Sequence, residues 1–441
     1  MQGYINKCGI YIFDGYNKGG EDKMDGVIVA LDIGSSKVCV AAGRLDKNRK
    51  VQILGITSYE TFGVKSGVIT DIDNVSDAIG NAVYKLEQLI DEKINDVVIS
   101  IPQNICDLVE NKGIVAVSSE DKEITENEIE KVLKAAKMIN IPSGYEIVDV
   151  IPDQFIVDGY ENIKEPLGMS GSKLEVDAKI LLCQTTVLNN IFKSVNKASL
   201  KVIDIIFEPL AVSNATLYKD ERSMGCMIID VGYDVTKIIV IKEDKIKYLN
   251  NINIAGVNIS NDLSYCFKIS SSEAEKVKHK YSNAYLGILQ NSSNVKVTNK
   301  NGQEIEVPFK DLIDIMSARV EEILYIVRDK VASEGLMDDI SSIIIVGAGI
   351  SQFNYIETLG RNIFNKIVRI GTTEFVGANN PEFSTVVGTI KTYFKINNSN
   401  YIVNSEEGST FFKSRSKTEE AATENKISIV KKVKEILKDF F

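Results

Sequence analysis

Runs of β-branched and apolar residues alternate along most of this chain with segments whose apolar residues recur every three or four positions. The runs Val27–Asp32 and Lys37–Ala42 are parted only by a short polar stretch, which is typical of a strand, a tight turn and a second strand. Helical spacing follows at Val75–Asp91, and another strand is expected at Asp96–Ile101. From residue 27 onward, the pattern predicts a mixed α/β protein.

The opening pattern occurs twice. An apolar strand ending in Asp32-Ile33-Gly34, a polar turn and then Lys37 is matched further on by a strand ending in Asp230-Val231-Gly232, a polar turn and then Lys237. Each second strand leads through a charged turn into a third strand. We interpret this as an internal duplication of a three-strand unit. It predicts two similar lobes, and a ligand between the lobes would contact both turns.

The two turns carry the chemistry of a phosphate site. A strand that ends in Asp-x-Gly places a carboxylate where it can hold Mg²⁺, usually through water, and the small residues beside it let backbone N–H groups converge on phosphate oxygens. The hydroxyls of Ser35 and Ser36 and the ammonium of Lys37 would add donors. One such turn alone is more often a plain hairpin, but its repetition favours a nucleotide site. A third glycine turn, Gly347–Gly349 after a buried strand, would let the backbone approach a base or ribose.

Composition narrows the function classes. The chain carries 51 Lys and Arg against 61 Asp and Glu, a net charge of −10, which argues against general nucleic-acid binding because that needs clustered cations. Its single histidine, His279, excludes a multi-histidine metal site. The six cysteines contain no CxxC pair, which fits a reducing cytoplasm better than a disulfide framework. Residues 1–24 are predicted to form a flexible extension, with an edge strand at Ile10–Phe13 as the alternative.

The order of these pieces resembles the actin-like ATPase superfamily and, within it, the FtsA family of bacterial cell-division proteins, over residues 25–395 and the tail. The resemblance rests on Ala30–Lys37, on Pro166-Leu167-Gly168-Met169-Ser170-Gly171 and on Glu208-Pro209-Leu210-Ala211. It implies an α/β, actin-like, two-lobed and duplicated fold with an FtsA-type inserted subdomain.

The resemblance also implies how the chain is divided. We expect a first lobe at 25–93, 185–223 and 373–395, the inserted subdomain at 94–184, a second lobe at 224–258 and 336–372, and a small subdomain of the second lobe at 259–335.

Site roles are carried over residue by residue. Asp32 and Asp230 resemble the catalytic aspartates on the Mg²⁺ side, and Glu208 stands where the bacterial actin MreB has its water-orienting glutamate. For Glu275 and Lys278, a solvated helix pair is the alternative. The residues expected to bind ATP are Asp32, Gly34, Ser35, Ser36 and Lys37 in the first turn, Asp230, Gly232 and Thr236 in the second, and Gly256, Glu275, Lys278, Gly347, Ala348 and Gly349 around the nucleoside.

The second turn departs from the family pattern, which is usually Asp-x-Gly-Gly-Gly-Thr-Thr. Two glycines are replaced by Tyr233 and Asp234, and one hydroxyl residue by Val235. Tyr233 narrows the permitted backbone, and Asp234 places a negative charge near the expected phosphates, which Lys237 would partly offset. We therefore expect weakened nucleotide binding and at most a slow ATPase.

The end of the chain suggests a membrane contact. Residues 396–425 are polar and aperiodic, as in a flexible linker, and 426–441 are predicted to form an amphipathic helix. Its lysines, among them Lys431, Lys432 and Lys434, outnumber its acidic residues five to two, which is typical of a helix in an anionic membrane interface. Docking on the protein's own core is the alternative. The apolar face consists of Ile427, Val430, Val433, Ile436, Leu437, Phe440 and Phe441.

FtsA proteins end in a helix of this kind, so the tail supports the same resemblance. The resemblance implies a protein that binds ATP and Mg²⁺, self-associates into filaments, and tethers FtsZ filaments to the cytoplasmic face of the membrane at midcell. The inserted subdomain would contact other divisome proteins. The alternatives are an adaptor of another membrane machine, similar to PilM, a sugar kinase of the same superfold, and a nucleotide-independent pseudo-ATPase scaffold.

Overall fold

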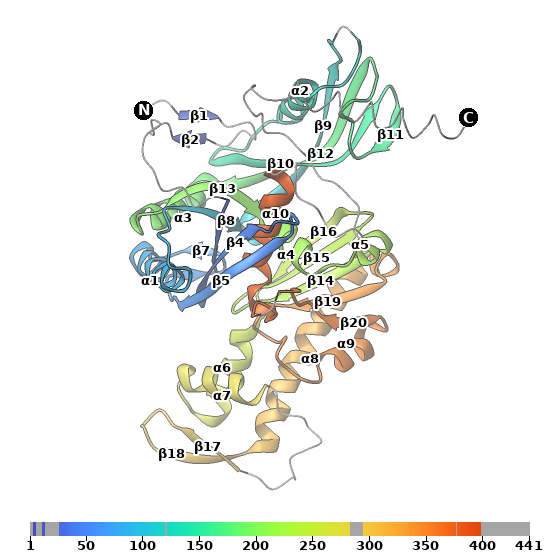
Figure 1. The fold of residues 1–441 in the computed structure, drawn as a ribbon. Coiled ribbons are helices and arrows are strands. Elements are labelled where there is room, and N and C mark those ends of the chain that lie inside the picture. Colours follow the sequence, from blue (N-terminus) through green and yellow to red (C-terminus); the bar gives the residue numbers. More distant parts are fainter. Residues whose placement is uncertain are drawn as a thin grey trace, which may run out of the picture.

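The computed structural model describes residues 3–5, 11–13, 26–119, 121–282, 294–375 and 377–397. Two lobes, each built on a five-stranded sheet, lie side by side, and a four-stranded sheet with one helix lies above them (Figure 1). A helical subdomain with a small hairpin extends below the second lobe (Figure 1).

The first lobe is an antiparallel meander of three strands extended by two parallel strands, in the order β13-β8-β3-β4-β5. These strands are β3 (Ile28–Ile33), β4 (Lys37–Leu45), β5 (Val51–Glu60), β8 (Asp96–Ile101) and β13 (Lys201–Phe207). Because side chains alternate along a strand, Val29 and Leu31 pack toward α1 (Ile72–Ile90) and α3 (Thr185–Lys197).

The opposite face of this sheet is lined by small residues, among them Ala30 and Ala41, and it receives a second pair of helices. These are α4 (Glu208–Thr216) and α10 (Ser384–Asn397), which pack tightly against each other. At Gly388, a Cβ atom would lie only 1.9 Å from the carbonyl oxygen of Ala211. The glycine therefore allows the two helices to approach closely behind the sheet.

The second lobe repeats the same topology, in the order β16-β15-β14-β19-β20. Three strands again form an antiparallel meander and two more are added in parallel. The predicted duplication and the actin-like fold are therefore confirmed. The strands are β14 (Cys226–Val231), β15 (Thr236–Lys242), β16 (Lys245–Ile252), β19 (Ser342–Val346) and β20 (Ile367–Ile370).

The strand register corrects one detail of the repeat. Asp32 lies opposite Cys39, and Asp230 lies opposite Lys237. The position equivalent to Lys237 is therefore Cys39, and the match that we expected between Lys37 and Lys237 is wrong.

The remaining elements of the second lobe form its outer layer and the lower subdomain (Figure 1). Except for α5 (Lys219–Met224), they contribute apolar side chains to one core with the face of the second sheet that carries Met227, Ile229 and Val231. They are α5, α6 (Gly256–Phe267), α7 (Ser271–Tyr281), β17 (Asn294–Thr298), β18 (Glu304–Pro308), α8 (Phe309–Ser333), the short helix η2 (Met337–Asp339) and α9 (Ile356–Phe364).

The inserted subdomain is an antiparallel sheet in the order β11-β10-β12-β9 with its own core under one helix. Its elements are β9 (Cys106–Ala116), α2 (Glu126–Ala136), β10 (Tyr145–Val157), β11 (Tyr160–Ile163) and β12 (Lys173–Gln184). The boundary expected at residue 94 is wrong, because β8 pairs with β3 and β13 in the first lobe. The insert begins after Ile101, through the short helix η1 (Gln103–Ile105).

Three smaller features complete the described chain. Strand β1 (Gly3–Ile5) pairs with β2 (Tyr11–Phe13), so the alternative of a strand is confirmed for Tyr11–Phe13, which forms a separate two-stranded sheet and not an edge of a larger one. A hairpin of β6 (Val64–Lys65) and β7 (Val68–Ile69) follows β5, and the short helix η3 (Pro381–Phe383) precedes α10.

The tail predictions are tested only at their first residues. Helix α10 runs to Asn397, so the first two residues of the expected linker, 396 and 397, are helical. The rest of the linker and the amphipathic segment 426–441 lie outside the described residues, as does most of the N-terminal extension. Within the described part, no helix is both long and apolar enough to cross a membrane.

Candidate functional site

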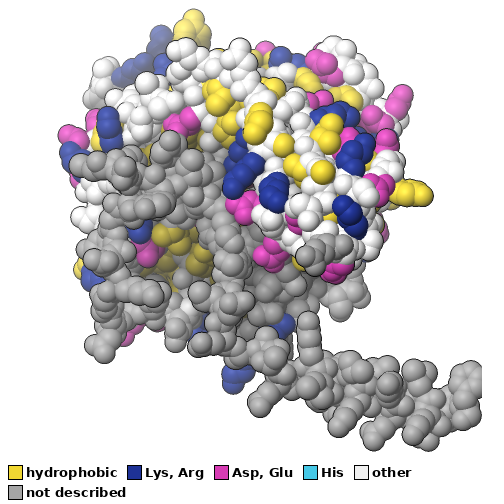
Figure 2. All heavy atoms as spheres, turned by 90° about the horizontal axis from the view of Figure 1, so that it is seen from above, with side chains coloured by type: hydrophobic (Ala, Val, Ile, Leu, Met, Phe, Trp, Pro, Cys, Tyr) yellow, Lys and Arg dark blue, Asp and Glu magenta, His cyan; other side chains and the backbone are white. Residues whose placement is uncertain are grey.

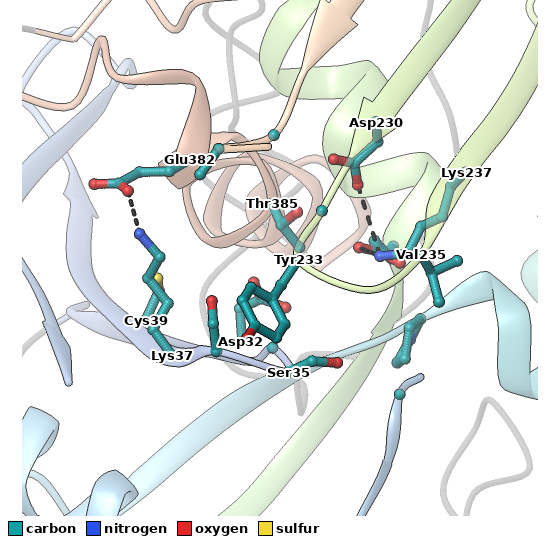
Figure 3. Close-up of a pocket in the computed structure, with 18 of the residues that line it drawn as sticks. Asp32, Ser35, Lys37, Cys39, Asp230, Tyr233, Val235, Lys237, Glu382 and Thr385 are labelled. Carbon is teal, nitrogen blue, oxygen red and sulfur yellow. Dashed lines mark hydrogen bonds and ion pairs between the residues drawn. The ribbon is translucent and has the colours of Figure 1, made fainter. Parts of the chain in front are cut away.

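A cavity lies between the lobes, where the two duplicated turns meet the starts of α4 and α10 (Figure 3). The two turns have the same backbone geometry. The Gly34 amide donates to the Lys37 carbonyl at 3.0 Å, and the Gly232 amide donates to the Val235 carbonyl at 3.0 Å. Of the residues predicted to bind nucleotide, those lining the cavity are Asp32, Gly34, Ser35, Ser36, Lys37, Asp230, Gly232, Gly347 and Ala348.

The cavity concentrates carboxylates. Asp32 accepts a hydrogen bond from the Ser100 hydroxyl at 2.6 Å, and enclosure, assisted by the charge of Glu208, raises the pKa of Asp32 to about 6. Enclosure likewise raises the pKa of Asp230, although Lys237 lies 3.6 Å away. Gathering these groups without a cation is unfavourable, so a bound divalent ion would relieve their repulsion.

This arrangement fits Mg²⁺ accompanied by phosphate. Among the described residues, no three His, Cys, Asp or Glu side chains form a group that could hold a metal ion by itself. Mg²⁺ usually keeps several waters and binds through one or two carboxylates plus substrate phosphates. Asp32 and Asp230 can supply those carboxylates, while the ligand would supply the other oxygens.

Glu208 is engaged within the protein. One of its oxygens pairs with the Lys237 ammonium, and the other accepts a hydrogen bond from the backbone amide of Gln103 at 3.3 Å. Burial opposes the charged form of Lys237, but Glu208 and Asp230 outweigh this and hold its pKa above the usual range. Lys237 therefore neutralises Glu208 in the first place, which leaves less of its charge to offset that of Asp234.

The departures in the second turn also have a structural consequence that the sequence reasoning did not foresee. Asp234 lines the cavity, but its carboxylate accepts a hydrogen bond from the Ser66 amide at 2.6 Å, which links the second lobe to the β6–β7 hairpin of the first. Neither Tyr233 nor Asp234 has a positive φ, so the turn forms without the backbone freedom of glycine. Tyr233 lines the cavity as well, near the first turn in the view of Figure 3.

The remaining predicted residues lie behind the lining. The Thr236 hydroxyl is buried and donates to the Ile254 carbonyl at 2.7 Å. Lys278 is buried as well and donates to the Gly256 carbonyl at 3.1 Å and to Glu275 at 2.6 Å. The solvated-pair alternative is therefore wrong for Lys278.

Three of the predicted glycines lie so close to neighbouring atoms that a side chain would not fit. Gly347 has a φ of +83°, and a Cβ there would lie 2.4 Å from an Asp230 carboxylate oxygen. At Gly349 it would lie 2.6 Å from the Gly232 carbonyl oxygen, and at Gly256 it would lie 3.0 Å from the same oxygen. These three glycines therefore pack the third turn and α6 directly against the second turn.

The sequence reasoning missed the contribution of α10. Glu382, Ser384 and Thr385 line the cavity, and Glu382 forms an ion pair with Lys37 (Figure 3). A local signal exists, because Asn380-Pro381 is a frequent way to begin a helix. That signal marks the helix but does not reveal that its start lies beside Lys37.

Comparison with protein families decides the relationship. A model described as "SHS2 domain inserted in FTSA" matches residues 105–182, and one described as "Cell division protein FtsA" matches residues 227–388. Cell division protein FtsA of Bacillus subtilis is 32% identical over 364 residues, covering 82% of both chains. The chain belongs to the FtsA family. Another FtsA, from Borreliella burgdorferi, is 31% identical and covers 82% of this chain and 90% of the relative.

A solved structure supports the fold of this FtsA-family chain independently of close sequence similarity. A chain of the PilM-PilN type IV pilus biogenesis complex aligns with a TM-score of 0.58 at 14% identity, covering 82% of this chain and 97% of that one. At this identity, the likeness is one of fold. The matched insert, residues 105–182, agrees with the sheet of β9 to β12.

Proposed function

We propose that this member of the FtsA family binds ATP with Mg²⁺ between its lobes, self-associates into filaments and tethers FtsZ filaments to the membrane. The observation that carries the proposal is the meeting of both phosphate-type turns at one cavity, each with its aspartate, in a chain of this family. In this site Asp32 and Asp230 hold the Mg²⁺. Backbone amides and the hydroxyls of Ser35 and Ser36 bind phosphate oxygens.

Nucleotide binding in this protein is weak and any hydrolysis is slow. The two lysines of the cavity are already paired with Glu382 and Glu208, so phosphate must compete with carboxylates of the protein itself. Because both oxygens of Glu208 are engaged, orienting a water molecule would require Glu208 to leave these partners. A nucleotide-independent scaffold is the second candidate, and the same two ion pairs favour it.

The membrane and partner functions rest on other parts of the chain. The predicted amphipathic segment 426–441 would lie on anionic lipids at the cytoplasmic face of the membrane at the division site. The insert exposes Ile114, Met138 and Tyr160, and Figure 2, which looks down on the molecule from above, shows hydrophobic side chains among charged ones on that face. Such a surface suits protein partners, which in this proposal are other divisome proteins.

Calorimetric titration of the full-length protein with Mg-ATP tests the central claim. We expect binding by the natural protein and a loss of at least about tenfold in affinity for Asp32→Ala, because the metal would lose one of two carboxylate ligands. Asp77→Ala, on an exposed position of α1, is the matched control and should bind like the natural protein. Unchanged affinity in Asp32→Ala would remove Asp32 from the site, and no binding by any form would favour the pseudo-ATPase scaffold.

A further inference from the structure

Two lysine–glutamate pairs stand at the starts of the two helices that pack between the lobes. Glu208 is the first residue of α4 and pairs with Lys237 from the second lobe. Glu382 lies in η3, immediately before α10, and pairs with Lys37 from the first lobe (Figure 3). The cavity is thus lined by two lysine ammonium groups, and each of them is already paired with a carboxylate of the protein.

The two pairs differ in how firmly the lysine is held. Lys237 lies near two carboxylates, Glu208 and Asp230, and its side chain is 15% exposed. Lys37 has one carboxylate partner in the described part of the chain, and its side chain is 28% exposed. Attraction between charges weakens with solvent exposure, so the Lys37 pair is the one that a ligand can more easily separate.

The surroundings of Lys37 already offer partners for an anion. The hydroxyl oxygen of Ser384, at the first residue of α10, is buried and has no hydrogen-bond partner among the residues that the structure describes, and Ser384 and Thr385 both line the cavity. Backbone N–H groups at the start of a helix also favour negative charge. A carboxylate of the protein now pairs with the ammonium at this place.

We propose that Glu382 is an internal counter-ion which a phosphate group must displace from Lys37, so that this glutamate lowers the affinity of the cavity for nucleotides. The inference rests on the proposed function, since it concerns how the same cavity receives its ligand. Lys37 cannot keep a close pair with Glu382 and also bind a phosphate with full strength. The carboxylate therefore makes the first turn selective for ligands with enough negative charge to compete.

The test is a double-mutant cycle by calorimetry with Mg-ATP on the full-length protein. Glu382→Gln keeps the shape and an oxygen acceptor but removes the charge, so it should tighten binding by roughly three- to tenfold, the scale of a partly exposed charge pair. Lys37→Gln should weaken binding. In the double variant, Glu382→Gln should bring no further gain, because its effect acts through Lys37.

Glu374→Gln is the matched control. Glu374 precedes α10 on the same segment and pairs with Lys391 at 3.2 Å, away from the cavity lining, so its loss should leave affinity unchanged. Thermal melts of all variants establish that each is folded. The gain in Glu382→Gln should also shrink as salt rises, since exposed charges are screened.

The outcomes separate the two proposals. If the natural protein binds Mg-ATP and Glu382→Gln leaves affinity unchanged or lowers it, Glu382 positions Lys37 and the counter-ion inference is wrong, while the nucleotide site stands. A gain in Glu382→Gln that persists undiminished in the Lys37→Gln background also overturns it. If neither the natural protein nor any variant binds Mg-ATP, the proposed function fails and the inference fails with it.

Discussion

At the scale of single residues, the cavity is dominated by carboxylates that the protein neutralises only in part. Within the described residues, Asp32 forms no ion pair with a lysine and accepts a hydrogen bond from Ser100, whereas Glu208 and Glu382 each have a lysine partner. Burial makes ionisation costly for Asp32, as it does for Asp230. Asp32 should therefore affect stability in addition to its proposed role in holding Mg²⁺.

The pKa of Asp32 predicts a pH-dependent stability. Its ordinary value of 3.8 is raised to about 6 in the folded protein, so between these values the folded state keeps a proton that the unfolded chain has lost. The contribution of Asp32 to stability therefore falls as pH rises through this window and stays low above pH 6. Asp32→Asn removes this dependence, and its stability relative to the natural protein should rise by about 1–3 kcal/mol between pH 4 and pH 7.

Denaturant melts without nucleotide or Mg²⁺ at a series of pH values measure this difference. Asp77→Asn, on the exposed face of α1, is the control and should follow the natural protein at every pH. A flat difference between Asp32→Asn and the natural protein would show that Asp32 titrates normally.

The unusual second turn gives another prediction at this scale. Replacing Tyr233 and Asp234 by glycine removes a charge from the cavity lining, and we expect ATP binding to tighten by roughly 1–2 kcal/mol at low salt, with a smaller gain at high salt. The replacement also removes the acceptor of the Ser66 amide, so hydrogen exchange at Ser66 should become faster. Unchanged exchange at Ser66 would contradict the bond across the lobes, and weaker ATP binding would mean that Tyr233 or Asp234 assists the ligand.

At the scale of elements, helices α4 and α10 bound the cavity, because Glu208 at the start of α4 and Ser384 at the start of α10 both line it. Their separation depends on Gly388, where a Cβ would lie 1.9 Å from the Ala211 carbonyl oxygen. An atom cannot be accommodated at that distance, so one helix would have to shift. A shift would move Glu208 relative to Glu382 and with them both lysines.

Gly388→Ala should accordingly destabilise the protein by about 1–3 kcal/mol, the usual cost of overpacking a close helix contact. Gly80→Ala in α1 is the control, because apart from its chain neighbours and its own helix backbone no described atom lies within 4 Å of the added Cβ. Alanine in a helix interior is favoured over glycine by roughly 0.5–1 kcal/mol, so this control should be neutral or stabilising. Urea unfolding of both variants measures the contrast, and equal effects of the two substitutions would show that the α4–α10 contact is not close in solution.

At the scale of the whole molecule, the base of the insert connects the three sheets around the cavity. The Gln103 side chain in η1 donates to the Asn250 carbonyl at 2.8 Å in the second lobe, and the Gln103 amide donates to Glu208 in the first. Asn104 donates to the Ser66 carbonyl at 2.6 Å. Ser66, whose amide donates to Asp234, is therefore also hydrogen-bonded to the base of the insert, so the second turn, the β6–β7 hairpin and the insert are joined by hydrogen bonds through one residue.

The proposed membrane tether also belongs to the scale of the whole chain, because it depends on residues far from the cavity in sequence. Replacing Leu437 and Phe440 by glutamate should abolish co-sedimentation with vesicles containing anionic lipids, since the apolar face would carry two charges into the interface. The Ser405→Glu, Ser409→Glu variant adds the same charge within the expected linker and should still bind. Full binding by the Leu437, Phe440 variant would refute the tether.

The sequence alone was sufficient for the features that depend on local periodicity and on repeated chemistry. Alternation of apolar residues located the paired strands, and helical spacing located α1, which begins at Ile72, three residues before the predicted start. The repeated Asp-x-Gly predicted two lobes whose turns face a common cavity. These succeed because strand pairing by a short turn and the facing of a helix are decided by neighbours along the chain.

Only the tertiary structure decided which side chains in those turns are available to a ligand. The sequence contains Lys37 and Glu382, which are 345 positions apart along the chain. They pair only because α10 packs on the face of the first sheet that is opposite to α1 and α3. The sequence also contains Thr236, but the burial of its hydroxyl against Ile254 depends on how β15 meets the loop before α6. Charges and hydroxyls are satisfied by whatever lies within hydrogen-bond distance, and packing of distant elements determines what lies there.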